Sequence, residues 1–360
     1  MPNIVFDYGI DPAYVHVSYS SFDVEIDSDT GQIASDNLML LFEDSVDRYK
    51  IGEVTATCTF GTQTVEQTVD VYMAATIVSY IKFTPIDNGT DSVNIELIST
   101  DKSTPPITNV WPFIYYSSNT GKNFQQMEVT YGSNNEQWYE FSKESPMYIY
   151  GINPRGVTKS DTTYVHFKFN GPSKFNISGN IMGLIDGFNE VTTIPSLYCF
   201  YKLFFGVGLI YDASELRLPA ISLQQNCYRE MFKGCSSITA APELPAMVTQ
   251  QYCYESMFMG CTSLISAPEL PAKTTTLYCY QNMFNGCSAL VDGPRVLPAE
   301  KIAGAAYYSM FEGCISLKNA PDIDGTDNSG WGGTTAMFKG CTSLVECPKF
   351  SFEKVGSSAC

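Results

Sequence analysis

The C-terminal half of the chain repeats one short unit, and this repeat restricts the possible folds more than any other feature of the sequence. Residues 227–235, 253–261 and 279–287 each read C-Y-x-x-M-F-x-G-C. Looser copies follow, and a degenerate copy begins at Cys199. From Met231 onward the Met positions are 26, 26, 27 and 27 residues apart. A period of about 20 to 29 residues predicts small units that bury their apolar faces by stacking on one another.

Each unit combines a predicted helical segment with an extended one. Tyr254, Met257 and Phe258 follow the spacing i, i+3, i+4, which predicts one face of a short helix. Gly260 comes next, where the end of a helix needs a residue that tolerates positive φ. Leu264 and the Pro-containing segment after it predict an extended stretch whose leucines point inward. The tyrosines at the Tyr254 position are therefore expected in the core.

The cysteines of the repeats form two columns, and three interpretations of them remain open. They are expected to pack in the core as small apolar side chains, with disulfides as the second interpretation and zinc as the third. The sequence has no C-x-x-C pair, and its two histidines are far from the columns. The first column comprises Cys199, Cys227, Cys253, Cys279 and Cys360, and the second comprises Cys235, Cys261, Cys287, Cys314 and Cys341.

The repeated pattern C-Y-x-x-M-F-x-G-C-[ST]-S-L-x-x-A-P-E-L-P-A resembles the BspA-like leucine-rich repeats of Bacteroidales surface proteins and of the phages of the same gut bacteria. The resemblance covers residues 194–360, and residues 253–272 carry the pattern without a break. Ala306 and Gly333 depart from it, because they replace the first-column Cys. The resemblance implies a leucine-rich-repeat fold and a recognition surface displayed on a cell or a virion. It supplies no catalytic residues.

The fold class predicted for the whole chain is mixed: two N-terminal all-β, Ig-like sandwich modules followed by a leucine-rich-repeat-type solenoid. In residues 1–76, Phe22, Val24 and Ile26 alternate with acidic residues, as in a half-buried strand. Further on, alternating residues on either side of Gly61-Thr62 predict a hairpin of the same sandwich, with Cys58 in its core. The solenoid is expected over residues 188–360 with about six repeats, the last incomplete.

The second β module is expected over residues 77–187. Ile81, Phe83 and Pro85 begin it, and an alternating segment from Val93 to Leu97 follows a tight-turn signal. Parts of this module also resemble the β-rich module that often precedes such repeats. These parts are residues 115–124 and 175–182, and further strands are expected at residues 127–131, 138–141, 147–152 and 164–169.

The charge of the chain narrows the classes of partner. Its 360 residues carry a formal net charge of −17, which disfavours binding to nucleic acid or to an anionic membrane surface. No apolar run is long enough to insert into a membrane. The N-terminus does not resemble a signal peptide. The sequence stops where the next repeat would begin, so we expect a longer natural chain or a subunit that covers this end.

Signals for catalysis and metal binding are weak. His16 and His166 each stand alone in a strand-like segment, where a structural role is the simpler interpretation. The sequence has no phosphate-binding glycine loop. Acidic residues 322–328 offer oxygen ligands for Ca²⁺ but lack EF-hand spacing, so a solvated loop is expected. No catalytic residue, cofactor or metal site is predicted.

Partner contacts are instead expected at exposed positions that vary between repeats, because such columns form the binding faces of repeat proteins. The predicted contact residues are Thr239, Glu243, Ile265, Glu269, Asp292 and Arg295, with Trp331 in an irregular insertion.

These features predict a non-enzymatic structural or binding protein, first of all a tail, fibre or capsid-surface component of a phage virion. The expected partners are other virion proteins and a host surface protein or glycan, and the chain is expected to be a homo-oligomer or a member of an assembly. The alternative is an adhesin of the bacterial cell surface. A carbohydrate-active enzyme is a weaker third hypothesis, since any acidic chain contains paired carboxylates.

Overall fold

The chain forms two compact units, residues 1–76 and 77–360. The boundary between them coincides with the one expected between the two β modules. The computed structural model describes residues 3–8, 49–60, 63–73, 77–86, 92–100, 112–118, 124–131, 136–325, 331–346 and 348–349.

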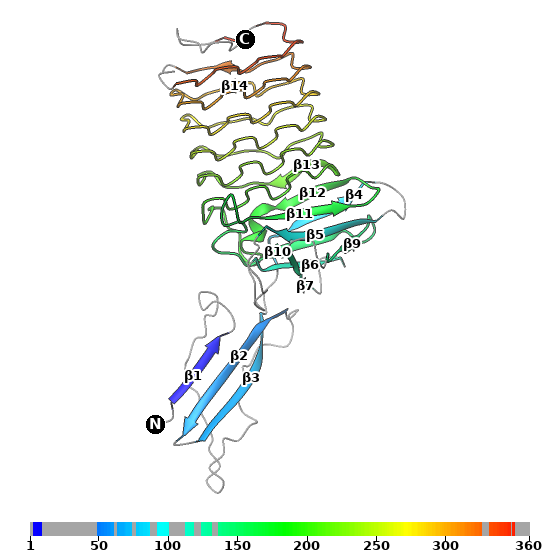
Figure 1. Cartoon of the computed structure of the whole chain (residues 1–360), viewed down its shortest axis with the longest axis vertical. Helices are drawn as coiled ribbons and strands as arrows, with labels where there is room; N and C mark the ends of the chain where they lie inside the picture. Colours follow the sequence, from blue (N-terminus) through cyan, green and yellow to red (C-terminus); the bar gives the residue numbers. More distant parts are fainter. Residues whose placement is uncertain are drawn as a thin grey trace. The chain divides into compact units, whose positions relative to one another are not determined.

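The described part of the first unit is an antiparallel sheet in the order β1-β2-β3 (Figure 1). Its strands are β1 (Asn3–Tyr8), β2 (Tyr49–Phe60) and β3 (Gln63–Met73). Strands β2 and β3 pair as far as Phe60, which lies opposite Gln63. This pairing agrees with the predicted hairpin around Gly61-Thr62. The predicted strand at Phe22, Val24 and Ile26 lies outside the described residues, so the Ig-like sandwich stays a prediction.

The second unit begins with two sheets. One has the strand order β13-β12-β4-β10-β6-β7 and the other has the order β11-β5-β8, with β9 also on β5. Their bounds are β4 Ile81–Pro85, β5 Val93–Ser99, β6 Ile114–Ser117, β7 Gln125–Gln126, β8 Val129–Tyr131, β9 Tyr139–Phe141, β10 Met147–Gly151, β11 Val165–Asn170, β12 Phe175–Asn180 and β13 Ile210–Arg217. A 3₁₀ helix, η1 (Ile181–Leu184), follows β12.

The two sheets pack face to face around aromatic side chains. Ile81 and Phe83 of β4 are buried, and β5 buries Val93, Ile95 and Leu97 in the predicted alternation. The Phe83 ring of the six-stranded sheet lies 5.3–6.1 Å, centroid to centroid, from Phe rings of β9 and β11 in the other sheet. The side chains of a strand point alternately to its two faces. Apolar residues at every second position therefore place one face of each sheet in the shared core.

The repeats form coils that lie one above another, beginning at the edge of the six-stranded sheet (Figure 1). Strand β13, in the first coil, pairs in parallel with β12. Each coil joins the next through backbone hydrogen bonds, as between Tyr254 N and Cys279 O at 3.0 Å and between Phe258 N and Met283 O at 2.9 Å. Two short strands, β14 (Val296–Leu297) and β15 (Asp322–Ile323), pair in parallel between later coils.

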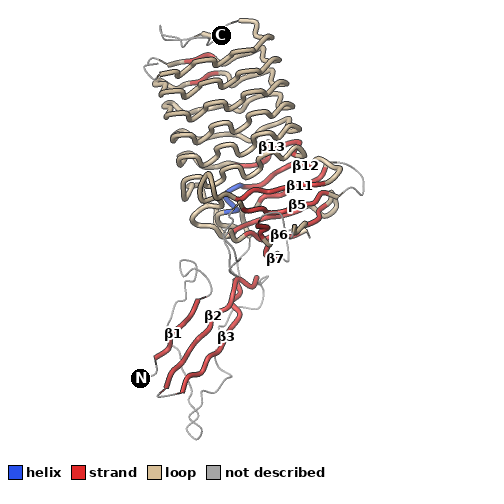
Figure 2. Tube along the Cα trace, in the orientation of Figure 1, coloured by secondary structure: helices blue, strands red, loops and turns tan. Residues whose placement is uncertain are grey.

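The predicted helix in each repeat is wrong. Residues 251–260 form consecutive turns, and the coils contain little regular secondary structure (Figure 2). Alternate amides donate to the next coil or to a carbonyl three residues earlier, as Met257 N does to Tyr254 O. The backbone takes positive φ at every fourth residue: 58° at Tyr252, 56° at Ser256 and 75° at Gly260. A residue in this region interrupts a right-handed helix, so the spacing i, i+3, i+4 reflects buried side chains without helical hydrogen bonds.

Two columns of stacked aromatic rings fill the interior of the coils. Neighbouring rings of the phenylalanine column lie 5.3–5.7 Å apart with nearly parallel planes, and those of the tyrosine column lie 5.7–5.8 Å apart. The members are Phe204, Phe232, Phe258, Phe284, Phe311 and Phe338 in the first and Phe200, Tyr228, Tyr254, Tyr280 and Tyr307 in the second. The tyrosines at the Tyr254 position therefore lie in the core, as expected.

The phenylalanine column continues into the β module. Phe167 of β11 stacks on Phe204 of the first coil with ring centroids 5.8 Å apart. The amide of Phe167 also donates to Leu203 O at 2.9 Å. One hydrophobic cluster includes both the sheets and the coils. The boundary expected near residue 187 thus falls inside a unit with a shared core, and the finer division stays a prediction.

The described cysteines are free thiols packed in this core, which agrees with the first of the three interpretations. All are buried except Cys341, which is partly exposed. The second-column thiols follow one pattern: each donates to the carbonyl of a phenylalanine in the preceding coil, as Cys261 does to Phe232 O at 3.2 Å and Cys287 does to Phe258 O at 3.1 Å. The columns therefore contribute both apolar packing and weak hydrogen bonds to the contact between coils.

We predict that the core thiols of the native protein react slowly with iodoacetamide. Burial raises the pKa of Cys227 and of Cys279 to about 12 and that of the partly exposed Cys341 to about 11. Since the thiolate is the nucleophile, Cys341 should be labelled faster than either. Peptide mass spectrometry after timed labelling measures this order, with denatured protein as the fully reactive control. Equal native rates at Cys227 and Cys341 would contradict the buried column.

We predict that His166 makes the chain sensitive to acid. Burial, assisted by the charges of Lys168 and Lys202, lowers the pKa of His166 from 6.5 to about 4. Because the folded-state pKa is the lower one, the stabilisation is present above pH 6.5 and is lost as the pH falls toward 4. When the pH is lowered from 7.5 to 4.5, the free energy of unfolding of the native chain should fall by about 2 kcal/mol more than that of His166→Gln. Denaturant unfolding of both proteins at the two pH values measures the difference, and parallel losses would refute it.

Candidate recognition surface

One face of the coils, here the turn face, is formed by the consecutive turns of each repeat. The left-handed residues lie in three columns that begin at Tyr198, Lys202 and Gly206 and recur in each later coil. The third column is glycine from Gly206 through Gly340. Non-glycine residues in the first two columns cost free energy in this backbone conformation. The hydrogen bonds between coils hold them in it, so the outward side chains have fixed backbone positions.

A row of aromatic and arginine side chains, the aromatic ridge, runs along the turn face. Its members are Arg229, Tyr252, Tyr278 and Trp331, together with the buried Tyr201, which is 4% exposed. The Arg229 guanidinium lies 5.8 Å from the ring centroid of Tyr201 and 5.3 Å from that of Tyr252. Tyr252 stacks on Tyr278 at 4.8 Å, and Trp331 meets Tyr278 edge-on at 5.8 Å. These contacts link the first coil to the last described one.

Gly304 makes room for the end of the ridge. Trp331 follows Gly304 by one repeat, since Tyr278 N donates to Gly304 O and Ala305 N donates to Trp331 O. A Cβ atom on residue 304 would lie 3.0 Å from Trp331 Nε1 and 3.2 Å from its Cδ1. The missing side chain therefore lets the indole lie over residue 304, where it contacts Tyr278. Trp331 remains 65% exposed, so most of its ring is available to a partner.

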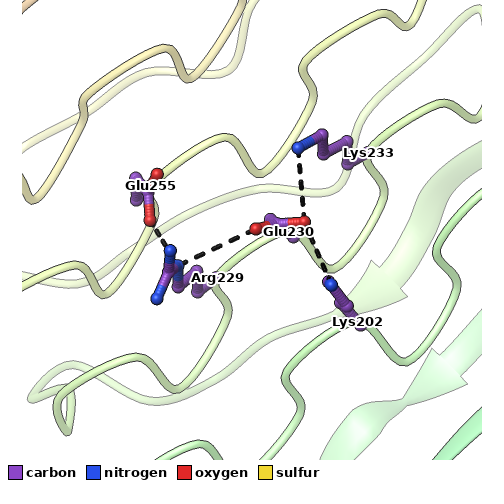
Figure 3. Close-up of polar contacts among 5 residues, drawn as sticks. All are labelled: Lys202, Arg229, Glu230, Lys233 and Glu255. Atoms are coloured by element: carbon purple, nitrogen blue, oxygen red, sulfur yellow. Dashed lines mark hydrogen bonds and ion pairs between the residues drawn. The ribbon is translucent and has the colours of Figure 1, made fainter. Parts of the chain in front are cut away.

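A charged cluster borders the ridge at the first three coils (Figure 3). It consists of Lys202, Arg229, Glu230, Lys233 and Glu255. Glu230 lies at its centre, with its carboxylate 3.6 Å from Lys202 Nζ, 3.3 Å from Lys233 Nζ and 3.9 Å from Arg229 Nε. Arg229 Nε also forms an ion pair with Glu255. Partial burial lowers the local dielectric, which strengthens these ion pairs relative to those on an open surface.

The electrostatics of Glu255 show that its burial outweighs its pairing. Burial raises the pKa of Glu255, although the charge of Arg229 acts in the opposite direction. The carboxylate is thus held with less stabilisation than a fully compensated pair would provide.

The predicted contact residues lie mostly in other columns. Thr239 and Ile265 are neighbours, with Ile265 N donating to Thr239 O at 3.3 Å. Asp292 lies beside this column, where its backbone bridges to Ser266 and its carboxylate accepts from Asn319 Nδ2 at 2.6 Å. These three residues therefore share one face of the coils.

The other predicted residues divide between two places. Glu243, Glu269 and Arg295 occupy the same position in successive repeats, and Arg295 Nε donates to Glu269 Oε1 at 3.1 Å. Arg295 is 89% exposed, and Glu243 is exposed as well. Trp331 is separate from all six, because its contact is with Tyr278 on the turn face. A role of these residues in binding stays a prediction.

Sequence reasoning missed Arg229, Tyr252 and Tyr278. The signal was the tyrosine on each side of a first-column cysteine, as in Tyr252-Cys253-Tyr254. Only the second tyrosine of each pair fits the buried spacing with Met and Phe. The first was left without a place in the core, and in the structure it is half-buried on the turn face.

A second polar group lies on the sheets. Glu96 of β5 is fully buried, and its Oε2 is 3.5 Å from Lys168 Nζ of β11. Lys168 also pairs with Glu136 at 3.0 Å and lies 4.8 Å from the ring centroid of Trp138. The hydrogen bond to Glu136 is the main cause that raises the pKa of Lys168, and the negative charge of Glu96 raises it further. Within the described residues, His, Cys, Asp and Glu form no group of three suited to a metal ion.

Comparisons with known proteins found no matching family model, no matching curated protein and no matching solved structure. Among the described residues, no helix has both the length and the apolar character needed to cross a membrane.

Proposed function

We propose that this chain is a non-enzymatic recognition and structural protein at the surface of a phage virion. The observation that carries the proposal is the aromatic ridge with its charged cluster. Tyrosine, tryptophan and arginine supply much of the binding energy in recognition surfaces. They lose little conformational entropy on binding when they are already held in place. Rigid coils with apolar ladders inside and such side chains outside are suited to presenting a binding face.

The virion setting rests on the resemblance of the repeats and of the preceding β module to those of Bacteroidales phages. The alternative is an adhesin of the bacterial cell surface, which would use the same face. In the virion setting the β modules would attach the chain to neighbouring virion proteins or to further copies of itself, while the repeats meet a host protein or glycan.

Immunogold labelling with an antibody against the chain tests the proposal. Purified virions and phage-free host cells would be labelled in parallel, with pre-immune serum as the control. Labelled virions are the expected result. Labelled surfaces of phage-free cells would favour the adhesin, and label confined to the cell interior would overturn both.

A further inference from the structure

The first left-handed column of the turn face lacks a tyrosine at the second coil. The first left-handed column reads Tyr198, Asn226, Tyr252 and Tyr278 along the first four coils. A short amide thus occupies the position between two tyrosines. Asn226 is only 1% exposed, and neither its Oδ1 nor its Nδ2 has a hydrogen-bond partner among the described residues. A buried amide without partners is unfavourable, so its presence between the rings indicates a group that pairs with it when a ligand is bound.

Cationic groups border this position. Arg229, three residues after Asn226, lies against the ring of Tyr252. Its closest contacts with the carboxylates of Glu230 and Glu255 are made through Nε. Lys202 lies 5.1 Å from the ring centroid of Tyr201. The charged cluster contains three cations and two carboxylates, so it is locally positive on a chain whose net charge is −17.

The free edge of a guanidinium fits a carboxylate in a bidentate geometry. A ligand carboxylate would therefore be expected on the terminal nitrogens of Arg229. It would also compensate the positive excess of the cluster, because Glu230 and Glu255 balance only part of it.

The rest of the turn face favours a ligand rich in hydroxyl groups. The half-buried side chains of the turn segments include several amides and tyrosines, next to the exposed apolar side chains of Leu197, Phe205 and Leu277. Amides and hydroxyls both donate and accept hydrogen bonds, as sugar hydroxyls do. The amides are Gln225, Gln251, Gln281, Asn282 and Asn285.

We propose that the turn face binds an acidic saccharide, with the sugar carboxylate on Arg229 and a sugar hydroxyl or acetamido group on Asn226. This inference rests on the proposed recognition function and names its ligand class. Binding at Asn226 requires a local rearrangement, because only 1% of this residue is exposed in the ligand-free chain. The exposed Trp331 offers an apolar ring further along the same face, where a longer saccharide would continue.

Calorimetric titration of the full chain with matched saccharides tests this inference. The probes are 3′-sialyllactose against lactose and an oligogalacturonate against its methyl ester, so each pair differs in the acidic group. We expect at least one acidic member to bind at least tenfold more tightly than its neutral match, with an affinity that falls as salt is added. Equal binding of acidic and neutral members, or no binding of either acidic probe, would overturn the inference.

Two variants locate the site. Arg229→Gln should weaken binding of the acidic probe at least tenfold, and Asn226→Ala should weaken it as well. Arg217→Gln is the matched control, because Arg217 is exposed on β13, outside the turn face and the predicted contact residues, and this variant should bind like the native chain. An unchanged affinity in Arg229→Gln with a normal unfolding curve would exclude this site. Equal binding of a poly-glutamate peptide would instead identify an acidic protein partner and overturn the saccharide assignment.

The two proposals fail in different ways. If virions are labelled but no acidic saccharide binds, the recognition function stands and its ligand class is wrong. If an acidic saccharide binds but virions are not labelled, the site stands and the virion setting is wrong.

Discussion

Replacing Phe258 with alanine is expected to destabilise the repeat-containing unit by about 3–5 kcal/mol, the range for truncating a buried Phe. Phe258 is fully buried and stacks on Phe232 at 5.6 Å and on Phe284 at 5.7 Å. The cavity would lie in the middle of the column, where both neighbouring coils lose a contact. Since each coil contacts mainly its neighbours, the array should lose coupling between its two halves. Denaturant unfolding of the full chain, followed by circular dichroism, measures the loss.

Phe205→Ala is the matched control for this prediction, because it makes the same change at a ring that is exposed on the turn face. It should cost no more than about 1 kcal/mol, mainly through the lost contact with Lys202 at 5.1 Å. Hydrogen exchange adds a second measurement: amides of the coils beyond Phe258 should exchange faster in Phe258→Ala than in Phe205→Ala. If both variants unfold at the same denaturant concentration, the phenylalanine column is not the main support of the coils.

Much of the side-chain burial in the repeats was predictable from the sequence, whereas their backbone was not. Tyr254, Phe258 and Leu264 recur at fixed intervals, and periodic apolar residues indicate a shared interior whatever the backbone does. The helix was wrong because a spacing of three and four is also produced by consecutive turns with a left-handed residue at every fourth position. Gly260 marked one such position, but Tyr252 and Ser256 are non-glycine residues whose positive φ has no signature in the sequence.

The candidate surface was predicted only in part, for a related reason. Trp331 stood out as a large aromatic residue in an irregular segment. Arg229 and Tyr252 did not, because their importance comes from contacts between residues of neighbouring repeats. Arg229 and Tyr252 meet only because both side chains face outward from neighbouring coils. The consecutive turns determine which side chains face outward, and a helix would have directed the same side chains differently.

Replacing Lys168 with methionine is expected to destabilise the β module by about 3 kcal/mol, because it removes the cation beside a fully buried carboxylate. Glu96 is 0% exposed, and Lys168 Nζ lies 3.5 Å from its Oε2. Methionine retains much of the aliphatic length of lysine, so the change mainly removes the charge. Lys339→Met is the control, since Lys339 pairs with Glu312 at 2.7 Å on the surface. An exposed pair of that kind contributes little to stability, so Lys339→Met should unfold close to the native chain.

A second substitution separates the lost charge from lost packing. Glu96→Gln removes the buried charge while keeping the shape of the side chain, so adding it to Lys168→Met should restore most of the stability. The four proteins of this cycle, unfolded in denaturant at neutral pH, give the coupling free energy between residues 96 and 168. A double variant as unstable as Lys168→Met alone would show that the loss comes from the other contacts of the ammonium, with Glu136 and the Trp138 ring. Recovery would show that the sheets carry a buried charge whose cost Lys168 offsets.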